Sequence, residues 1–392
     1  MKSRYLIAVL IFILLATIKT WVVFYLNETL LCVLADILIV FFGSRNFKVS
    51  DYSKTVSVFA IMAVLICTRG NINAYISAII NISPFILFCF LRREIRMSFL
   101  LSFNKVFAII ILVSTICWVL FLLGVPMPNS YITYGERYEF DNYYTFLNFH
   151  HTEGIISFFP RFCSIIIEPG DLACILCLLI FLDKYRFNKW YNIVYLIALI
   201  LTFSLAGLFM FTIGLLPNII NSSRKNRIRA LVSIVIITGI ASFAIRASED
   251  SVVYQMIGQR LIEDEDTGQI SGYNRNSAGF SEFFDNVFWK SDKVLFGYGD
   301  DIQYGGVDMR MFIAKFGIVS LLVYVLFLFV SYVKKHSKYG LWFFILFFMI
   351  FYKGYSMLFY SGMLMLLISG LDRCYVDKEL QTDLWPSKNW LK

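Results

Sequence analysis

MRMFIAKFGIVSLLVYVLFLFVSYVKKHSK, residues 309 to 338, carries the pattern that decides the fold. The run from 309 to 333 is mostly apolar, and it stops abruptly at Lys334 and Lys335. Because an α-helix rises about 1.5 Å per residue, a run of this length crosses a hydrocarbon core of about 30 Å. An apolar run that ends in a short basic break is typical of a transmembrane helix anchored at the cytoplasmic face.

The same pattern recurs along the chain, in which 59% of the residues are hydrophobic. We therefore predict an all-α polytopic integral membrane protein with about 12 transmembrane helices, forming a single domain over residues 1–392. The predicted spans lie at about 5–26, 28–43, 55–68, 73–91, 106–124, 163–182, 190–204, 206–221, 230–246, 309–333, 341–353 and 355–371.

Charge sets the orientation of these spans. Lysine and arginine gather in alternate short breaks, such as 92–96, 184–189 and 224–229. The positive-inside rule places those breaks and both termini in the cytoplasm. Two long extracytoplasmic loops follow, at about 125–162 and 247–308. The net charge of +8 is then explained by topology and by contact with anionic membrane lipids, so it requires no nucleic acid as a partner.

Lys19 and Asp36 are charged residues inside predicted spans. If the first hairpin turns near Asn27, they lie at similar depth on antiparallel helices, which predicts an ion pair within the hairpin. A proton or ion pathway is the alternative interpretation. No other pair of spans is expected to carry matched buried charges, which weighs against a transporter.

The first outer loop, which leads into the sixth predicted span, contains candidate catalytic residues. His150 and His151 are adjacent, but without further ligands nearby they make a poor zinc site, so no metal is expected. His151 remains a candidate for a general base or a phosphate contact. Pro160 favours the start of a short helix that Pro169 ends or restarts.

Arg161 and Glu168 lie between those two prolines and are seven residues apart, close to two helical turns. A mostly helical segment would therefore place both side chains on one face. The alternative is that Glu168 is a charge at a helix N-terminus and Arg161 an anchor at the membrane interface.

The second outer loop contains Arg260 and Arg275. Asn274 and Asn276 flank Arg275, and planar donors around a guanidinium suit a phosphate or sugar hydroxyls. Asp264-Glu-Asp266 has the spacing of a metal and nucleotide-sugar motif, but its predicted place outside the membrane favours a solvated acidic loop.

Three short motifs carry a resemblance to a known family. They are Arg161-Phe-Cys-Ser-Ile-Ile-Ile-Glu-Pro-Gly170, which opens a span, Leu295-Phe-Gly-Tyr-Gly299, which closes the second loop, and Lys315-Phe-Gly-Ile318. With the layout of spans and loops, they resemble O-antigen and capsular repeat-unit polymerases of the Wzy type. The second outer loop has no histidine, which speaks against the sister family of O-antigen ligases.

The resemblance implies a metal-independent glycosyltransferase without cofactors in the bacterial inner (plasma) membrane. It would transfer a growing polysaccharide from undecaprenyl pyrophosphate onto a new lipid-linked repeat unit, as in lipopolysaccharide biosynthesis, and a chain-length regulator is a possible partner. Cations would stabilise the departing pyrophosphate, and one base would deprotonate the acceptor hydroxyl. An O-antigen ligase, a lipid-linked oligosaccharide flippase or transporter, and a membrane protein that uses both loops for docking are the alternatives.

Residues for these roles follow from the resemblance together with the residue chemistry. Arg161, Arg260 and Arg275 are expected at the pyrophosphate and sugar, with Arg137 in reserve. Glu168 is the first candidate for the catalytic base and His151 the second.

Overall fold

The computed structural model describes residues 2–18, 20, 27–68, 72–134, 138–145, 147–150, 160–221, short pieces between 227 and 261, 276–354 and 360–381. Within these ranges the chain is mainly helical. The α-helices are α1 (Lys2–Thr17), α2 (Glu28–Gly43), α3 (Asp51–Cys67), α4 (Ile72–Phe90), α5 (Arg93–Leu122), α6 (Pro169–Leu182), α7 (Trp190–Leu201), α8 (Leu205–Asn221), α10 (Ala278–Asn286), α11 (Met309–Val333), α12 (Lys338–Lys353) and α13 (Ser361–Gln381). The strands are β1 (Asn129–Tyr134), β2 (Tyr138–Thr145) and β3 (Asn148–His150).

Each predicted span except 230–246 overlaps one of these helices, and the helical class of the fold is confirmed. α2 and α11 begin and end where the sequence predicts. α5 starts earlier than its predicted span, at Arg93. The prediction left out the first turns because they carry charged residues, but these turns are helical as well. α6 starts later than predicted, at Pro169, because the residues before it are not helical. The predicted span 230–246 lies largely outside the described residues.

Three of the described helices, α4, α5 and α11, are long and apolar enough to cross a membrane on their own. Shorter apolar helices cover Ser3–Thr17, Pro169–Leu182, Trp190–Leu201 and Leu205–Pro217. The apolar helices indicate association with a membrane. The count of 12 spans remains a prediction.

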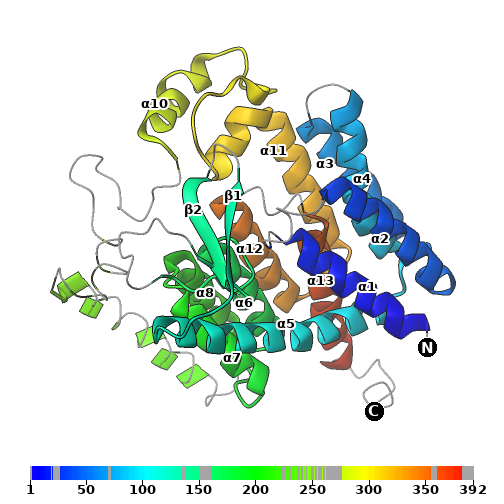
Figure 1. Ribbon diagram of the computed structural model, residues 1–392. Coiled ribbons are helices and arrows are strands. Elements are labelled where there is room, and N and C mark those ends of the chain that lie inside the picture. The colour runs from blue at the N-terminus through cyan, green and yellow to red at the C-terminus, as the bar shows by residue number, and fades with distance from the viewer. Residues whose placement is uncertain are drawn as a thin grey trace.

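The helices form two neighbouring groups (Figure 1). α1 to α4 pack against one another, and α3 also packs along α11. The second group contains α6, α7 and α8, with α5 against α7. α12 and α13 join the groups, since α13 contacts α1, α4, α5 and α6, while α12 contacts α6, α8 and α11.

A small antiparallel sheet, ordered β1-β2-β3, is an addition that the sequence analysis did not predict. Its register pairs Asn129 with Thr145 and Tyr143 with His150. Asn148 is buried and exchanges hydrogen bonds with Ser114 of α5: Asn148 Nδ2 donates to the Ser114 carbonyl over 2.8 Å, and the Ser114 hydroxyl donates to Asn148 Oδ1 over 2.7 Å. The first long loop is therefore fastened to the side of α5.

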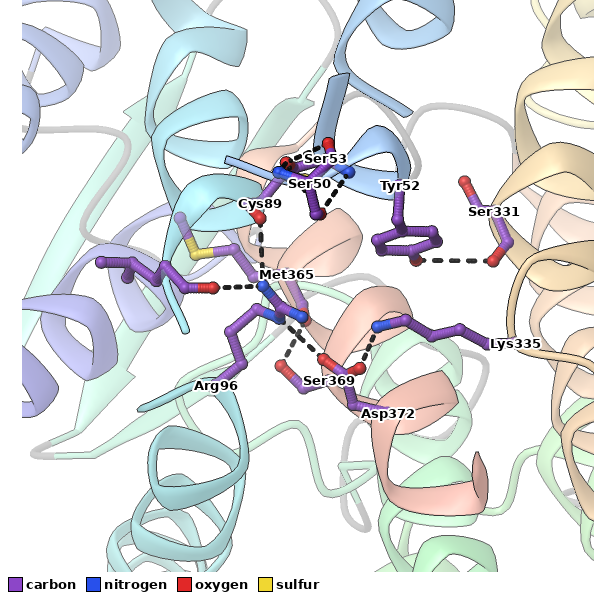
Figure 2. Close-up of polar contacts among 11 residues, drawn as sticks. Ser50, Tyr52, Ser53, Cys89, Arg96, Ser331, Lys335, Met365, Ser369 and Asp372 are labelled. Atoms are coloured by element: carbon purple, nitrogen blue, oxygen red, sulfur yellow. Dashed lines mark hydrogen bonds and ion pairs between the residues drawn. The ribbon is translucent and has the colours of Figure 1, made fainter. Parts of the chain in front are cut away.

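A buried cluster of charges connects several helices at one place (Figure 2). Asp372 of α13 accepts from Arg96 Nε over 2.7 Å and also pairs with Lys335, which follows α11. Arg96 donates further to the Cys89 carbonyl at the end of α4, and the Lys335 ammonium lies 4.1 Å from the centre of the Tyr52 ring. One carboxylate with two cations thus connects α3, α4, α5, α11 and α13 at this end, which we call the basic end.

Candidate functional site

α6 is the central helix of its group, since all 14 of its residues are buried. Pro169 occupies the first turn, where its missing N–H costs nothing, and Glu168 is the N-cap residue. The Glu168 side chain makes no capping hydrogen bond and is only partly buried. A carboxylate at this helix end is electrostatically stabilised by the helix dipole while staying accessible.

The expectation of a helix over residues 161–168 is wrong. The Phe162 N–H donates to the carbonyl of Leu201 at the end of α7 over 3.1 Å, and Ile166 forms an isolated antiparallel bridge with Thr20. Ser164 has a left-handed backbone with φ 53°. Because these distant elements satisfy backbone groups of the segment, it stays buried without forming a helix, and it turns at Ser164 and Ile165. Arg161 and Glu168 are therefore not two residues of one helical face.

Arg161 lies against the turn between α7 and α8. Its Nε donates to the Thr202 carbonyl over 2.8 Å, and its Nη2 donates to the Phe203 carbonyl over 3.3 Å. These carbonyls follow the last residue of α7, so the guanidinium offsets the negative end of that helix dipole. Phe203 itself has φ 46°, and Arg161 thus supports a turn of unusual conformation.

An ion pair that the sequence analysis did not predict lies below Glu168. Lys353, the last residue of α12, donates to Asp171 Oδ1 in the first turn of α6 over 2.9 Å, and both side chains are buried. Gly170 makes room for the lysine, because a Cβ there would stand 2.6 Å from Lys353 Nζ and 3.6 Å from the hydroxyl of Ser204. With the cluster at Asp372, this pair corrects the expectation that no other helices carry matched buried charges.

Arg161 and the first turn of α6 meet at the turn between α7 and α8. Arg161 donates to the carbonyls of Thr202 and Phe203, and a Cβ on Gly170 would stand 3.6 Å from the hydroxyl of the next residue, Ser204. The buried Cys163 thiol donates to the carbonyl of Arg161 over 3.6 Å. Arg161 and the start of α6 therefore lie in one neighbourhood although they do not share a helix.

Ser164 adds a second unusual feature next to Cys163. It is completely buried, and its hydroxyl has no hydrogen-bond partner within the described part of the chain. Backbone strain and an unsatisfied buried hydroxyl each cost free energy, of order 1 to 3 kcal/mol, and such costs are concentrated at functional sites. The segment before α6 is therefore a candidate for a functional role.

The two glycine motifs noted in the sequence touch each other directly. Gly297 and Gly317 both have positive φ, 73° and 84°. A Cβ on Gly297 would stand 2.4 Å from the carbonyl oxygen of Lys315, and one on Gly317 would stand 2.3 Å from that of Leu295. Gly317 interrupts α11, and the Tyr298 N–H donates to the Ala314 carbonyl there over 2.8 Å. The end of the second loop is thus inserted at the kink of α11.

The same loop is fastened at the start of α11. Asp308 caps the helix by accepting from the Arg310 and Met311 N–H groups, and it also accepts from Asn276 Nδ2 over 2.6 Å. Val307, directly before Asp308, has its carbonyl oxygen 4.0 Å from the position of a Cβ on Gly354. Gly354 follows Lys353, so the anchored end of the second loop lies next to the end of α12, whose last residue pairs with Asp171 of α6.

Arg161 and Glu168 are the predicted site residues that the structure describes. Arg137, His151, Arg260 and Arg275 lie outside the described residues, as do Asp264 and Asp266, so their predicted roles stay predictions. Of the predicted hairpin pair, Lys19 also lies outside. Asp36 accepts a hydrogen bond from the Ser83 hydroxyl of α4, and its Oδ1 has no partner among the described residues.

The site residues that sequence reasoning missed are Asp171 and Lys353. Both are unusual in the sequence, since each is a charged residue at the border of an apolar run. No pattern in the neighbouring residues indicates that the two side chains meet. Taken together, the fold and this region define a membrane-associated helical protein with a charged centre at the start of its buried helix. Comparison with family models, with curated proteins and with solved structures found no match for this chain.

Proposed function

We propose that the chain is a polysaccharide polymerase that transfers a growing glycan from a lipid pyrophosphate onto a new lipid-linked repeat unit at the outer face of the bacterial inner membrane. The observation that carries the proposal is that the ends of both long loops are connected to the first turn of α6. The first loop leads directly into it through Arg161 and Glu168. The second ends at Val307, next to Gly354, which follows Lys353, the ion-pair partner of Asp171. Two lipid-linked substrates have to meet at one such centre.

Glu168 suits the role of base. It stands at a helix N-terminus, makes no capping bond and is partly exposed, so its carboxylate is open to an acceptor hydroxyl. Pyrophosphate is already a good leaving group, and the main demand on the protein is a cation near its departing oxygen. Arg161 supplies a cation in the same neighbourhood, with a guanidinium oriented by two backbone carbonyls.

The buried pair below these residues supports them. The ion pair of Lys353 and Asp171 connects the first turn of α6 to the end of α12, and this contact fixes the position of the backbone at Glu168. We assign them a positioning role. Arg260, Arg275 and the reserve Arg137 belong to the proposed pyrophosphate and sugar site on sequence grounds, and His151 is the second candidate for the base.

The test is a glycan ladder in cells that lack their own polymerase gene, with membrane levels of each variant checked. Glu168→Gln preserves shape but removes the proton acceptor, so single repeat units should remain as the product. Glu94→Gln, an exposed change at the basic end, is the matched control and should give full ladders. Full ladders from well-expressed Glu168→Gln protein would move the base to His151.

The same gel separates the rival functions. Loss of a flippase would leave no repeat units outside the membrane at all. Loss of a ligase would leave long chains on the lipid pyrophosphate, whereas loss of a polymerase leaves only single units. Absence of any glycan phenotype on deletion would favour a docking or structural protein.

A further inference from the structure

We propose that residues 287–296, which connect α10 to the kink of α11, form a membrane-interface anchor that rests in the lipid bilayer. This segment, called the anchor segment below, contains a turn of 3-10 helix at Phe288–Lys290. The proposed occupant of its apolar side is the lipid of the leaflet next to the two long loops. The inference concerns how the second loop is held, and it does not depend on the proposed reaction.

The anchor segment exposes several large apolar side chains. Val287, Trp289, Leu295 and Phe296 are about half exposed, with 48% for Trp289 and 55% for Leu295. Between them, Phe288 is fully buried, so the segment is fixed on its inner side. An ordered loop that turns several apolar side chains outward marks an interaction surface.

The inner side of the segment is held by a separate aromatic core. Phe280 and Phe284 of α10 pack with Phe288, Met311 and Ala314. The Phe284 and Phe288 rings are stacked, with centroids 5.3 Å apart. Figure 1 shows α10 beside the start of α11, at one end of the molecule. The exposed side chains are therefore held in place by the packed inner side of the segment.

The position of the anchor segment along α11 indicates that its apolar side faces lipid. The Ile318 N–H donates to the Val294 carbonyl over 3.0 Å, and the Val319 N–H donates to the Leu295 carbonyl over 3.1 Å, so the segment lies at the level of Gly317. From Gly317 to the basic break at Lys334 the helix rises about 26 Å at about 1.5 Å per residue. A hydrocarbon core of about 30 Å that starts at Lys334 thus ends just beyond Leu295.

The exposed side chains also continue a lipid-facing stripe of α11. Leu322, Leu326, Phe329 and Val333 are exposed at spacings of four and three, which is one face of this apolar helix. Leu295 is bonded to Val319, one turn above Leu322, and so extends that stripe toward the loop. Lys290 and Lys293 are exposed in the same segment, and tryptophan with lysine is the usual composition at the level of lipid head groups.

The test is photo-crosslinking of the full-length protein in vesicles of phosphatidylethanolamine and phosphatidylglycerol. The photoreactive residue p-benzoyl-phenylalanine is placed at Leu295 and, in a second variant, at Val287. Leu326 on α11 is the positive control and Glu282, exposed on α10, the negative control. Mass spectrometry of the irradiated protein measures the fraction that carries a phospholipid.

We expect lipid adducts at Leu295 close to the yield at Leu326 and several-fold above the yield at Glu282. Adducts to protein at Leu295 and Val287, within the chain or to a second copy, would overturn the proposal and indicate a protein contact. Reaction at Leu326 without lipid adducts at either anchor position would overturn it as well. Size-exclusion chromatography before irradiation restricts the comparison to variants that fold.

Discussion

Lys353 and Asp171 form a buried ion pair of 2.9 Å between the end of α12 and the first turn of α6. Removing one partner leaves an uncompensated buried charge, which costs about 3 to 5 kcal/mol. We expect Lys353→Met and Asp171→Asn each to lower the thermal unfolding temperature of the purified protein markedly. The double variant should recover part of that loss, because an absent pair costs less than a lone charge.

The matched control is the pair of Lys189 and Asp183, which has a similar distance of 2.7 Å but a lysine side chain that is 34% exposed. The buried Asp183 carboxylate also accepts from Asn192 Nδ2 over 2.7 Å, so it keeps a partner when the lysine is removed. Lys189→Met should therefore lower the unfolding temperature less than Lys353→Met does, because solvent already screens the exposed lysine. Strictly additive losses for Lys353 and Asp171 would contradict the coupling.

Gly170 offers a second probe of the same pair. A Cβ at this position would stand 2.6 Å from Lys353 Nζ, so Gly170→Ala should displace the lysine from Asp171. We expect its unfolding temperature to fall, and to fall less when Lys353→Met is already present. An equal effect in both backgrounds would mean that the alanine acts through some other contact.

The kink of α11 predicts a difference among glycines of similar backbone conformation. Gly297, Gly317 and Gly299 all have positive φ, but a Cβ would meet backbone atoms within 2.6 Å at the first two and nothing within 4 Å at Gly299. Gly299→Ala should cost about 1 to 2 kcal/mol from backbone conformation alone. Gly297→Ala and Gly317→Ala should lower the yield of folded protein much further, as judged by size-exclusion chromatography after expression. Equal yields for all three variants would contradict the close backbone contact.

Arg161 should not tolerate replacement by lysine. Its Nε and Nη2 reach two successive carbonyls, and a single ammonium cannot reproduce that planar arrangement. We expect Arg161→Lys and Arg161→Ala to lose glycan ladders to a similar extent at equal membrane levels. Full ladders from Arg161→Lys would show that only a charge is needed there, and full ladders from Arg161→Ala would remove Arg161 from the site.

Topology can be checked with reporter fusions. A reporter joined after Lys335 should behave as cytoplasmic, and one joined near Gly268 as external, because basic breaks stay inside. An external signal from the Lys335 fusion would reverse the assignment of both long loops.

Helices were predictable here because their signal is local. α2 and α11 are continuous apolar runs with polar ends, and their bounds follow from the sequence alone. The segment before α6 was not predictable, since its non-helical form depends on Leu201 and on the bridge from Thr20. The Lys353 pair joins residues 182 positions apart, and no periodicity or spacing encodes such a contact.

In the candidate site, too, some features could be predicted from the sequence and others could not. Glu168 and Pro169 were recognisable as the start of a helix, and the structure gives them that place. The glycine motifs were recognisable as unusual, but only the folded chain brings Leu295 against Gly317. Sequence thus indicates which residues are exceptional, whereas their partners are determined by tertiary packing.

The shortness of α6 has a consequence for where a glycan would be handled. Its 14 residues rise about 21 Å, less than the roughly 30 Å of a bilayer interior. If the helix starts its crossing at the basic end, Glu168 is recessed several ångströms beneath the opposite surface, and the non-helical chain above it is tolerated because protein surrounds it. A carrier lipid could then keep its hydrocarbon tail among the surrounding lipids and present its phosphates to the protein from the side. Only the sugars would have to enter the protein as far as the Glu168 carboxylate.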